Sequence, residues 1–119
     1  MKFAGAALIV FFVAASFASL AAQDKQTQVR TVHGVVMDKQ DNTVSAGVVY
    51  LENKRTQAIR TYISDDHGEY RFSGLDPNVD YDLHAELNGM TSIDRTVSSF
   101  DTRKDIVINL KLDHAKSGK

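Results

Sequence analysis

Apolar and polar residues alternate with a period of two through most of the chain after residue 30. The clearest case is residues 81–87, where apolar and polar side chains occupy alternate positions. This period is typical of strands that bury one face. Turn signals separate such segments at intervals of about ten residues, which favours an all-β sandwich. We therefore expect a seven-stranded antiparallel β-sandwich with strands over residues 32–37, 44–51, 59–63, 70–72, 81–87, 91–100 and 106–112.

Three of the turn signals have specific side-chain chemistry. Residues 64–68 combine acids that can cap backbone N–H groups with a glycine that can take positive φ. Residues 76–78 read Asp-Pro-Asn, which fits a type I turn. Asn88-Gly89 is the strongest two-residue hairpin signal in the chain. We expect it to join the strand over 81–87 to the irregular strand over 91–100.

The first 22 residues have a different pattern. Lys2 precedes an uncharged run over residues 3–22, whose last residues are small and lead into a polar segment over 23–28. This order predicts a secretory signal peptide cleaved after Ala21 or Ala22. The alternative is an uncleaved membrane anchor, because the run is long enough to span a bilayer. We expect an exported chain, periplasmic or extracellular, with a lead-in over 23–28, one domain over 29–112 and a flexible tail over 113–119.

Two stretches resemble a known family. Residues 34–38 with 44–51, and the block S-D-D-H-G-E-Y-R-F-S-G-L over 64–75, are similar to carboxypeptidase regulatory-like domains. The similarity continues through 76–85 and covers nearly all of residues 29–112. It implies a seven-stranded transthyretin-like (prealbumin-like), Ig-like Greek-key sandwich, grouped with carbohydrate-binding-like folds. Asn78 stands where the family usually has Gly; because Asn tolerates positive φ, we expect the turn to persist.

Composition excludes several classes of function. The chain has 119 residues, 14 Lys and Arg against 15 Asp and Glu, and no Cys. The absence of Cys excludes disulfides, iron–sulfur sites, thiol chemistry and a lipoprotein anchor. The nearly balanced charge disfavours nucleic-acid binding, which requires a basic excess.

Candidate metal ligands have weak patterns. The four His residues lack any spacing typical of zinc sites. Asp65, Asp66 and Glu69 could offer carboxylate oxygens to Ca²⁺, but calcium loops typically place their ligands at alternate positions. Capping of the turn around Gly68 explains the same residues, and we favour it. We expect no metal and no other cofactor, with calcium at this turn left open.

Catalytic relatives of the implied fold do not match either. A hydroxyisourate hydrolase would carry His three residues before Asp38, where this chain has Val35, and its C-terminal Tyr-Arg-Gly-Ser is absent. An isopeptide-forming adhesin domain would carry Lys where this chain has Val36. We expect no enzyme activity.

The predicted outward positions include apolar side chains. Val35 and Met37 on the first strand, and Val48 and Tyr50 on the second, break the rule that outward residues are polar. If the two strands pair, these four residues and His33 would form one apolar patch, and such patches often mark partner sites. The alternatives are cover by a loop or the lead-in, or exposed β-formers without a binding role.

Two functional hypotheses follow. The first is an exported, non-catalytic interaction module that docks onto an envelope or secreted protein. The second is a carbohydrate-binding module that uses exposed aromatic side chains, for which Tyr50, Tyr62 and Phe100 are the candidates. The absence of Trp weakens the second hypothesis.

Overall fold

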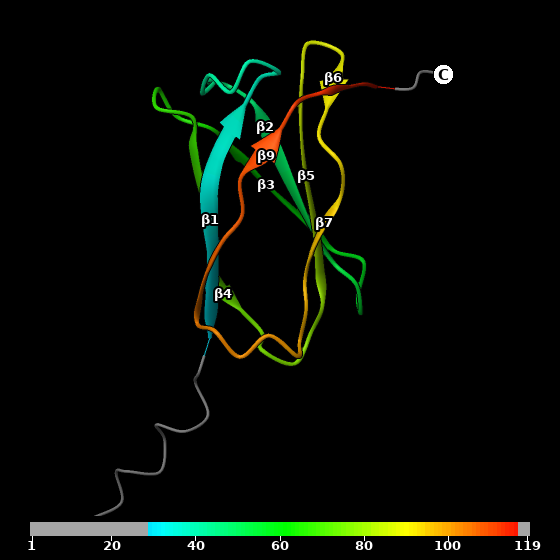
Figure 1. Ribbon diagram of the computed structural model, residues 1–119. Helices are drawn as coiled ribbons and strands as arrows, with labels where there is room; N and C mark the ends of the chain where they lie inside the picture. The colour runs from blue at the N-terminus through cyan, green and yellow to red at the C-terminus, as the bar shows by residue number, and fades with distance from the viewer. Residues whose placement is uncertain (1–28, 117–119) are drawn as a thin grey trace, which may run out of the picture.

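The computed structural model describes residues 29–116 and shows two β-sheets packed face to face (Figure 1). Within this range all regular elements are strands, and no helix could cross a membrane. The predicted signal peptide, the lead-in and residues 117–119 lie outside the described residues. The strands are β1 (Arg30–Met37), β2 (Val48–Asn53), β3 (Ile59–Ile63), β4 (Glu69–Leu75), β5 (Tyr81–Leu87), β6 (Met90–Thr91), β7 (Arg95–Val97), β8 (Asp105–Val107), β9 (Leu110–Lys111) and β10 (His114–Ala115).

β1 is the central strand of the smaller sheet. It pairs with β4 in antiparallel orientation and with β8 and β9 in parallel orientation, and Figure 1 shows β9 beside β1. The larger sheet has the order β10-β6-β5-β2-β3, with β7 also paired to β5. The prediction of an all-antiparallel sandwich is therefore wrong at β1. After β7 the chain crosses to the smaller sheet and enters β8 in the direction of β1.

Two predicted strands are each divided in two. Residues 91–100 form β6 and β7, and residues 106–112 form β8 and β9. At the first break, Ser92 Oγ accepts the N–H of Ala85 at 2.9 Å. At the second, Asn109 Oδ1 accepts the N–H of Val35 at 3.1 Å. In each case a side-chain oxygen replaces a backbone acceptor. The strand can therefore stop pairing at this point while the N–H group of the neighbouring strand keeps a hydrogen bond.

Part of the segment predicted as a tail, residues 113–119, forms a short strand. β10 pairs with β6, with His114 opposite Thr91 and Ala115 opposite Met90. The N–H of Lys116 donates to the carbonyl of Gly89 at 2.7 Å. Pairing at a sheet edge requires only backbone groups, so a polar segment with no apolar alternation can add a strand.

The hydrophobic core lies between the sheets and comes from alternate residues of the strands. All of its members fall between residues 32 and 112, so the sandwich contains its own core. Burial of each large aliphatic side chain contributes about 1.5–3 kcal/mol to folding. Core residues with an exposed fraction of 2% or less include Val32, Val36, Val49, Leu51, Phe72, Leu75, Leu83, Ala85, Ile106 and Leu110.

Tyr70 links β4 and β1 to the β8–β9 connection. It extends from β4 past Gly34, its partner residue on β1, and its hydroxyl donates to the carbonyl of Ile108 at 2.6 Å. A Cβ atom at Gly34 would lie 2.0 Å from that same carbonyl oxygen. The approach of the β8–β9 connection to β1 therefore requires glycine. Burial raises the pKa of the Tyr70 phenol, which keeps it a hydrogen-bond donor.

Arg30, at the start of β1, is a buried charge that the sequence pattern does not reveal. Its side chain is 2% exposed. Nη1 donates to the carbonyls of Ser98 at 2.7 Å and Asp101 at 3.2 Å. Nη2 donates to those of Val79 at 3.1 Å and Asp76 at 3.3 Å. One guanidinium thus ties the 76–79 turn and the β7–β8 loop to the first strand.

The turn predictions are confirmed. Val79 N–H donates to the Asp76 carbonyl at 3.2 Å, which closes the turn over 76–79. Asn78 keeps a negative φ there, so the turn does not need the glycine that is usual in the family. Asn88 and Gly89 have φ values of 53° and 81°, and join β5 to β6.

The capping role of residues 64–68 is also confirmed. Gly68 has a φ of 78°. Asp65 Oδ1 accepts the N–H groups of Glu69 and His67, both at 2.9 Å. These bonds, that from Glu69 first, lower the pKa of the Asp65 carboxyl below its usual range.

Candidate functional site

The predicted apolar patch is divided between two faces of the molecule. His33, Val35 and Met37 lie on β1 in the smaller sheet, whereas Val48 and Tyr50 lie on β2 in the larger sheet. The condition for a single patch, pairing of these two strands, is not met. The connection between them carries the chain from one sheet to the other, and each strand finds other partners. Two separate surfaces therefore have to be considered.

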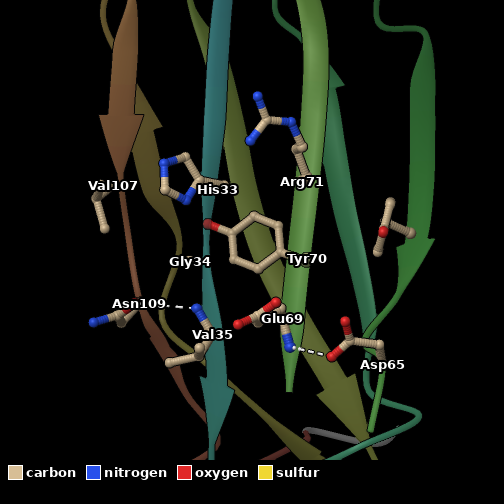
Figure 2. Close-up of a pocket in the computed structure, with 10 residues that line it drawn as sticks. His33, Gly34, Val35, Asp65, Glu69, Tyr70, Arg71, Val107 and Asn109 are labelled. Atoms are coloured by element: carbon tan, nitrogen blue, oxygen red, sulfur yellow. Dashed lines mark hydrogen bonds between the residues drawn. The ribbon is translucent and has the colours of Figure 1, made fainter. Parts of the chain in front are cut away.

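The first surface contains a hollow of about 410 Å³, which we call the His33 hollow. Figure 2 shows the residues that line it. β1, β4, the end of β3 and the β8–β9 connection contribute to it. It brings together residues for which the sequence suggested different roles. These are His33 and Val35 of the predicted partner site, Tyr62 of the predicted glycan site, and Asp65 and Glu69 of the turn. Its lining is His33, Gly34, Val35, Tyr62, Asp65, Glu69, Tyr70, Arg71, Val107 and Asn109.

Polar groups in the His33 hollow are partly engaged already. His33 Nε2 lies 3.3 Å from Asp105 Oδ2, and Figure 2 shows His33 and Arg71 both above Tyr70 in the view. Asp65 uses its carboxylate to cap its own turn. In the part of the chain that the structure describes, no group of three or more His, Cys, Asp or Glu side chains is arranged to hold a metal ion. The hollow can offer hydrogen bonds and an aromatic edge from Tyr62.

The second surface, which we call the Tyr50 face, is the outer side of β3, β2 and β5. Tyr50 on β2 lies between Thr61 on β3 and His84 on β5. The rings of Tyr50 and His84 are stacked, with centroids 4.9 Å apart and planes inclined by 12°. The strand register thus builds a flat aromatic pair at the centre of the face.

Carboxylates surround this aromatic pair. Glu86 Oε2 lies 3.0 Å from His84 Nε2, and Asp94 Oδ1 lies 3.7 Å from His84 Nδ1. Lys116 Nζ lies 2.9 Å from Glu86 Oε1. The hydrogen bond from Lys116, followed by that from His84, lowers the pKa of the Glu86 carboxyl below its usual range. This side of the face is therefore ionised at neutral pH.

A second ion pair lies at the other end of the face. Lys54 Nζ contacts Asp82 Oδ2 at 3.1 Å and Glu52 Oε1 at 3.9 Å. The hydrogen bond to Asp82 raises the pKa of Lys54. With Glu86 and Asp94, the face has four carboxylates against the ammonium groups of Lys54 and Lys116, an excess of two negative charges.

Apolar residues and two hollows complete the Tyr50 face. Ile59 and Ile63 on β3 are 60% and 63% exposed. The hollow on one side of Tyr50, about 170 Å³, is lined by Tyr50, Glu52, Ile59, Asp82, His84 and Asp94. The hollow on the other side, about 280 Å³, is lined by Val48, Tyr50, Glu86, Leu87, Asn88, Gly89 and Lys116. Tyr50 therefore separates two depressions in one acidic surface.

The three aromatic residues proposed for glycan binding do not form one platform. Tyr50 is half-buried in its stack with His84. Tyr62 is on the opposite side of β3, where its ring packs edge-on against Phe72 with centroids 6.0 Å apart. Phe100 is on the β7–β8 loop, is 91% exposed, and lines neither hollow beside Tyr50 nor the His33 hollow.

Sequence reasoning missed several members of the Tyr50 face. The sequence pattern predicts His84 only as an outward histidine without the spacing of a zinc site, and Ile59 and Ile63 only as members of a strand. Each occupies an outward position in a segment where apolar and polar residues alternate, so its exposure could be predicted from the sequence. Their proximity depends on β2 lying between β3 and β5, which the pattern does not specify.

A comparison with protein families identifies the chain. The family model for the carboxypeptidase regulatory-like domain matches residues 31–113. The chain belongs to this family. The match confirms the resemblance found in the sequence and includes both surfaces described above, apart from Lys116. Among curated proteins, none matches this carboxypeptidase regulatory-like domain.

Solved structures show the same fold at low sequence identity. The domain is similar to catechol 1,2-dioxygenase from Acinetobacter sp. ADP1, with a TM-score of 0.57, 11% identity, and coverage of 78% of this chain and 55% of that chain. It is also similar to a dioxygenase domain from Streptomyces sp. SirexAA-E, with a TM-score of 0.51, 12% identity, and coverage of 73% and 80%. For the pilus 2b backbone protein of group B streptococcus the TM-score is 0.54, at 11% identity, and coverage is 72% and 41%.

The chain spans about half the length of the catechol 1,2-dioxygenases that it matches and covers 53–55% of those chains. At these identities the likeness shows the fold alone. The neighbours include dioxygenases and a pilus backbone protein, so one sandwich occurs in proteins with unrelated tasks. Function has to be argued from the surfaces of this domain.

Proposed function

We propose that this chain is an exported, non-catalytic interaction module that binds an envelope or secreted protein through the Tyr50 face. Export is inferred from the signal-peptide pattern of residues 1–22. A non-catalytic role is supported by the family to which the chain belongs and by the lack of a catalytic motif in the sequence.

The observation that carries the proposal is the composition of the Tyr50 face. It has an aromatic pair at its centre, exposed Ile59 and Ile63 along one side, and an excess of carboxylates around them. Within residues 29–116, no further strand is layered on this face. Aromatic residues are enriched at the centres of protein interfaces, and charged groups are commoner at their rims.

The charge of the face defines the chemistry of its partner. An excess of two negative charges favours a surface with Lys or Arg side chains. A guanidinium or ammonium group can lie in the hollow of about 170 Å³, between the Tyr50 ring and Asp82 or Asp94. We therefore infer that the partner presents a basic segment.

The test is capture from an envelope and secreted-protein extract by the immobilised chain beginning at Gln23, followed by measurement of Kd for the captured protein. Tyr50→Ser should weaken binding tenfold or more, because a central aromatic contact contributes about 1.4 kcal/mol or more. Val35→Ser, on the outer side of β1, is the matched control and should leave Kd unchanged. Rising salt should weaken binding. Binding that Tyr50→Ser leaves unaltered, or that strengthens with salt, would refute the proposal.

A second candidate function is glycan binding in the His33 hollow. The observation that favours it is the placing of the exposed Tyr62 ring beside hydrogen-bonding side chains from Glu69, Arg71 and Asn109. Sugars are typically bound by such a combination of a ring and polar groups. Retention of the chain on an immobilised polysaccharide, abolished by Tyr62→Ala and unaffected by Tyr50→Ser, would favour glycan binding over the first proposal.

A further inference from the structure

β3 is an edge strand with one unpaired side. It is the last strand of the larger sheet and, in the described chain, pairs only with β2. All five of its residues are exposed, although the inner side chains Arg60 and Tyr62 also contact Phe72 on β4. A free edge of this kind presents backbone N–H and C=O groups to which another strand can pair.

The hydrogen bonds at both ends of the β2–β3 ladder show which groups are free. The N–H of Asn53 donates to the carbonyl of Ala58 at 2.9 Å, and the N–H of Ser64 donates to the carbonyl of Gly47 at 2.8 Å. In an antiparallel ladder, bonded and non-bonded pairs alternate. Even-numbered residues from 58 to 64 therefore bond to β2, and the odd-numbered residues direct their N–H and C=O groups to the free edge.

The residues of β3 are arranged almost symmetrically about its centre. Ile59 and Ile63 are equally distant from Thr61, and Arg60 and Tyr62 lie between. Two antiparallel copies centred on Thr61 place Ile opposite Ile, Thr opposite Thr, and Arg60 opposite Tyr62 of the second copy. We propose that β3 pairs in this register with β3 of a second copy of this chain, which joins the two larger sheets into one sheet of a two-fold symmetric dimer.

This register uses all of the free backbone groups. The outward-directed residues Ile59, Thr61 and Ile63 of each copy exchange N–H and C=O bonds with the same set in the other copy. If one copy of β3 shifts by two residues along the other, one isoleucine of each copy has no backbone hydrogen-bond partner in the other strand. The register centred on Thr61 is therefore the one that satisfies the whole edge.

Side chains on both faces of the strand support the same register. Ile59 and Ile63, 60% and 63% exposed in the single chain, cover each other across the new ladder. On the other face, the Arg60 guanidinium lies 5.4 Å from the centre of the Phe72 ring. Tyr62 of the second copy adds another ring beside this cation, and no charge directly faces a like charge.

The dimer enlarges the binding surface without depending on the proposed function. Three strand spacings separate β2 of one copy from β2 of the other, so the two Tyr50 side chains would lie about 14 Å apart on one continuous face. A partner with repeated basic segments could contact both copies, which raises its overall affinity.

The test uses charge at the two-fold axis, where residue 61 of one copy meets residue 61 of the other. Thr61→Lys and Thr61→Glu each place two like charges opposite one another, and a mixture of the two places opposite charges there. By sedimentation equilibrium of the chain beginning at Gln23, the wild type should dimerise at micromolar concentration. Each variant alone should raise the dimer Kd tenfold or more, and the equimolar mixture should restore association.

Thr96→Lys is the matched control, because Thr96 is opposite Asp82 on the same face but is on β7. It should dimerise as the wild type does. Far-UV circular dichroism should show that all variants keep their strands, since the Thr61 side chain is exposed and its N–H group does not bond to β2. A wild type that stays monomeric at about 100 μM, or association that Thr61→Lys leaves unchanged, would overturn the proposal. Association lost in both variants but not restored by mixing would overturn the register.

Discussion

At the scale of single residues, Arg30 is the one charged residue among the buried residues of the described chain. Its guanidinium is buried and bonds to carbonyls from two loops that are distant in sequence. Arginine can do this because its donors spread in a plane, whereas the donors of lysine lie at a single atom. The strand and both loops therefore depend on the shape of this side chain as well as its charge.

Arg30→Lys tests that role. We expect it to lower the free energy of unfolding by about 2–4 kcal/mol, because several buried carbonyls lose a charged donor. Urea denaturation of wild type and variant measures the difference. Arg103→Lys, in the exposed ion pair with Asp101 on the β7–β8 loop, is the control and should change stability by under about 1 kcal/mol. Equal effects of the two substitutions would contradict the account.

Neither Arg30 nor Gly34 could be assigned its role from the sequence. Arg30 precedes an alternating segment, and its acceptors come from loops that approach it only in the folded sandwich. Gly34 occupies an inward position whose constraint is the carbonyl of Ile108, on a strand connection at the far end of the chain. In contrast, Asp65 acts within its own turn, so its capping role could be predicted.

At the scale of elements, segments that depend on local signals were predicted well. β5 coincides with the alternating segment 81–87, and Asn88-Gly89 closes its hairpin. The boundaries of β6 to β9 could not be predicted, because the breaks occur where Ser92 and Asn109 accept backbone bonds from strands distant in sequence. β10 was missed because its pairing involves only the backbone.

The loop between β7 and β8 gives an expectation about pH. The side chain of Arg103, held against Asp101 at 2.6 Å, lowers the pKa of the Asp101 carboxyl from its usual 3.8 to about 2. Folding therefore favours the ionised form, and the unfolded chain binds more protons between these values. The contribution of this pair to stability is present above about pH 4 and is lost as the pH falls to about 2.

Asp101→Asn should reduce the dependence of the unfolding free energy on pH in that window. Arg103→Gln should have the same effect, because it removes the main cause of the lowered pKa. Urea denaturation at several pH values between 2 and 5 measures the slope. An unchanged slope in both variants would show that the loop pair does not contribute.

At the scale of the whole molecule, the fold class was predictable and the division into sheets was not. Alternation identified the strands, and the family block over 64–75 indicated the sandwich, which the match over 31–113 confirms. Alternation gives each side chain an inward or outward direction, but the sheet to which a strand belongs depends on its long-range partners. Val35 and Tyr50 are both outward, as expected, yet on different sheets.

The sandwich consequently has two surfaces of different chemistry. The His33 hollow is lined by polar groups that mostly have partners, and the Tyr50 face combines an aromatic pair with excess negative charge. The Tyr50 face is also next to the free edge of β3, through which a second copy would extend the same surface. We therefore propose that a basic partner binds across this face.

The most direct test is to map the bound surface by amide chemical shifts of the isotopically labelled chain during titration with the captured partner. We expect the largest changes on β2 and β5, at residues 48–52 and 82–86. The outer positions of β1 and β4 should be unchanged, apart from effects transmitted through the core. Changes concentrated at residues 33–35, 69–71 and 107–109 would place binding in the His33 hollow and rule out binding across the Tyr50 face.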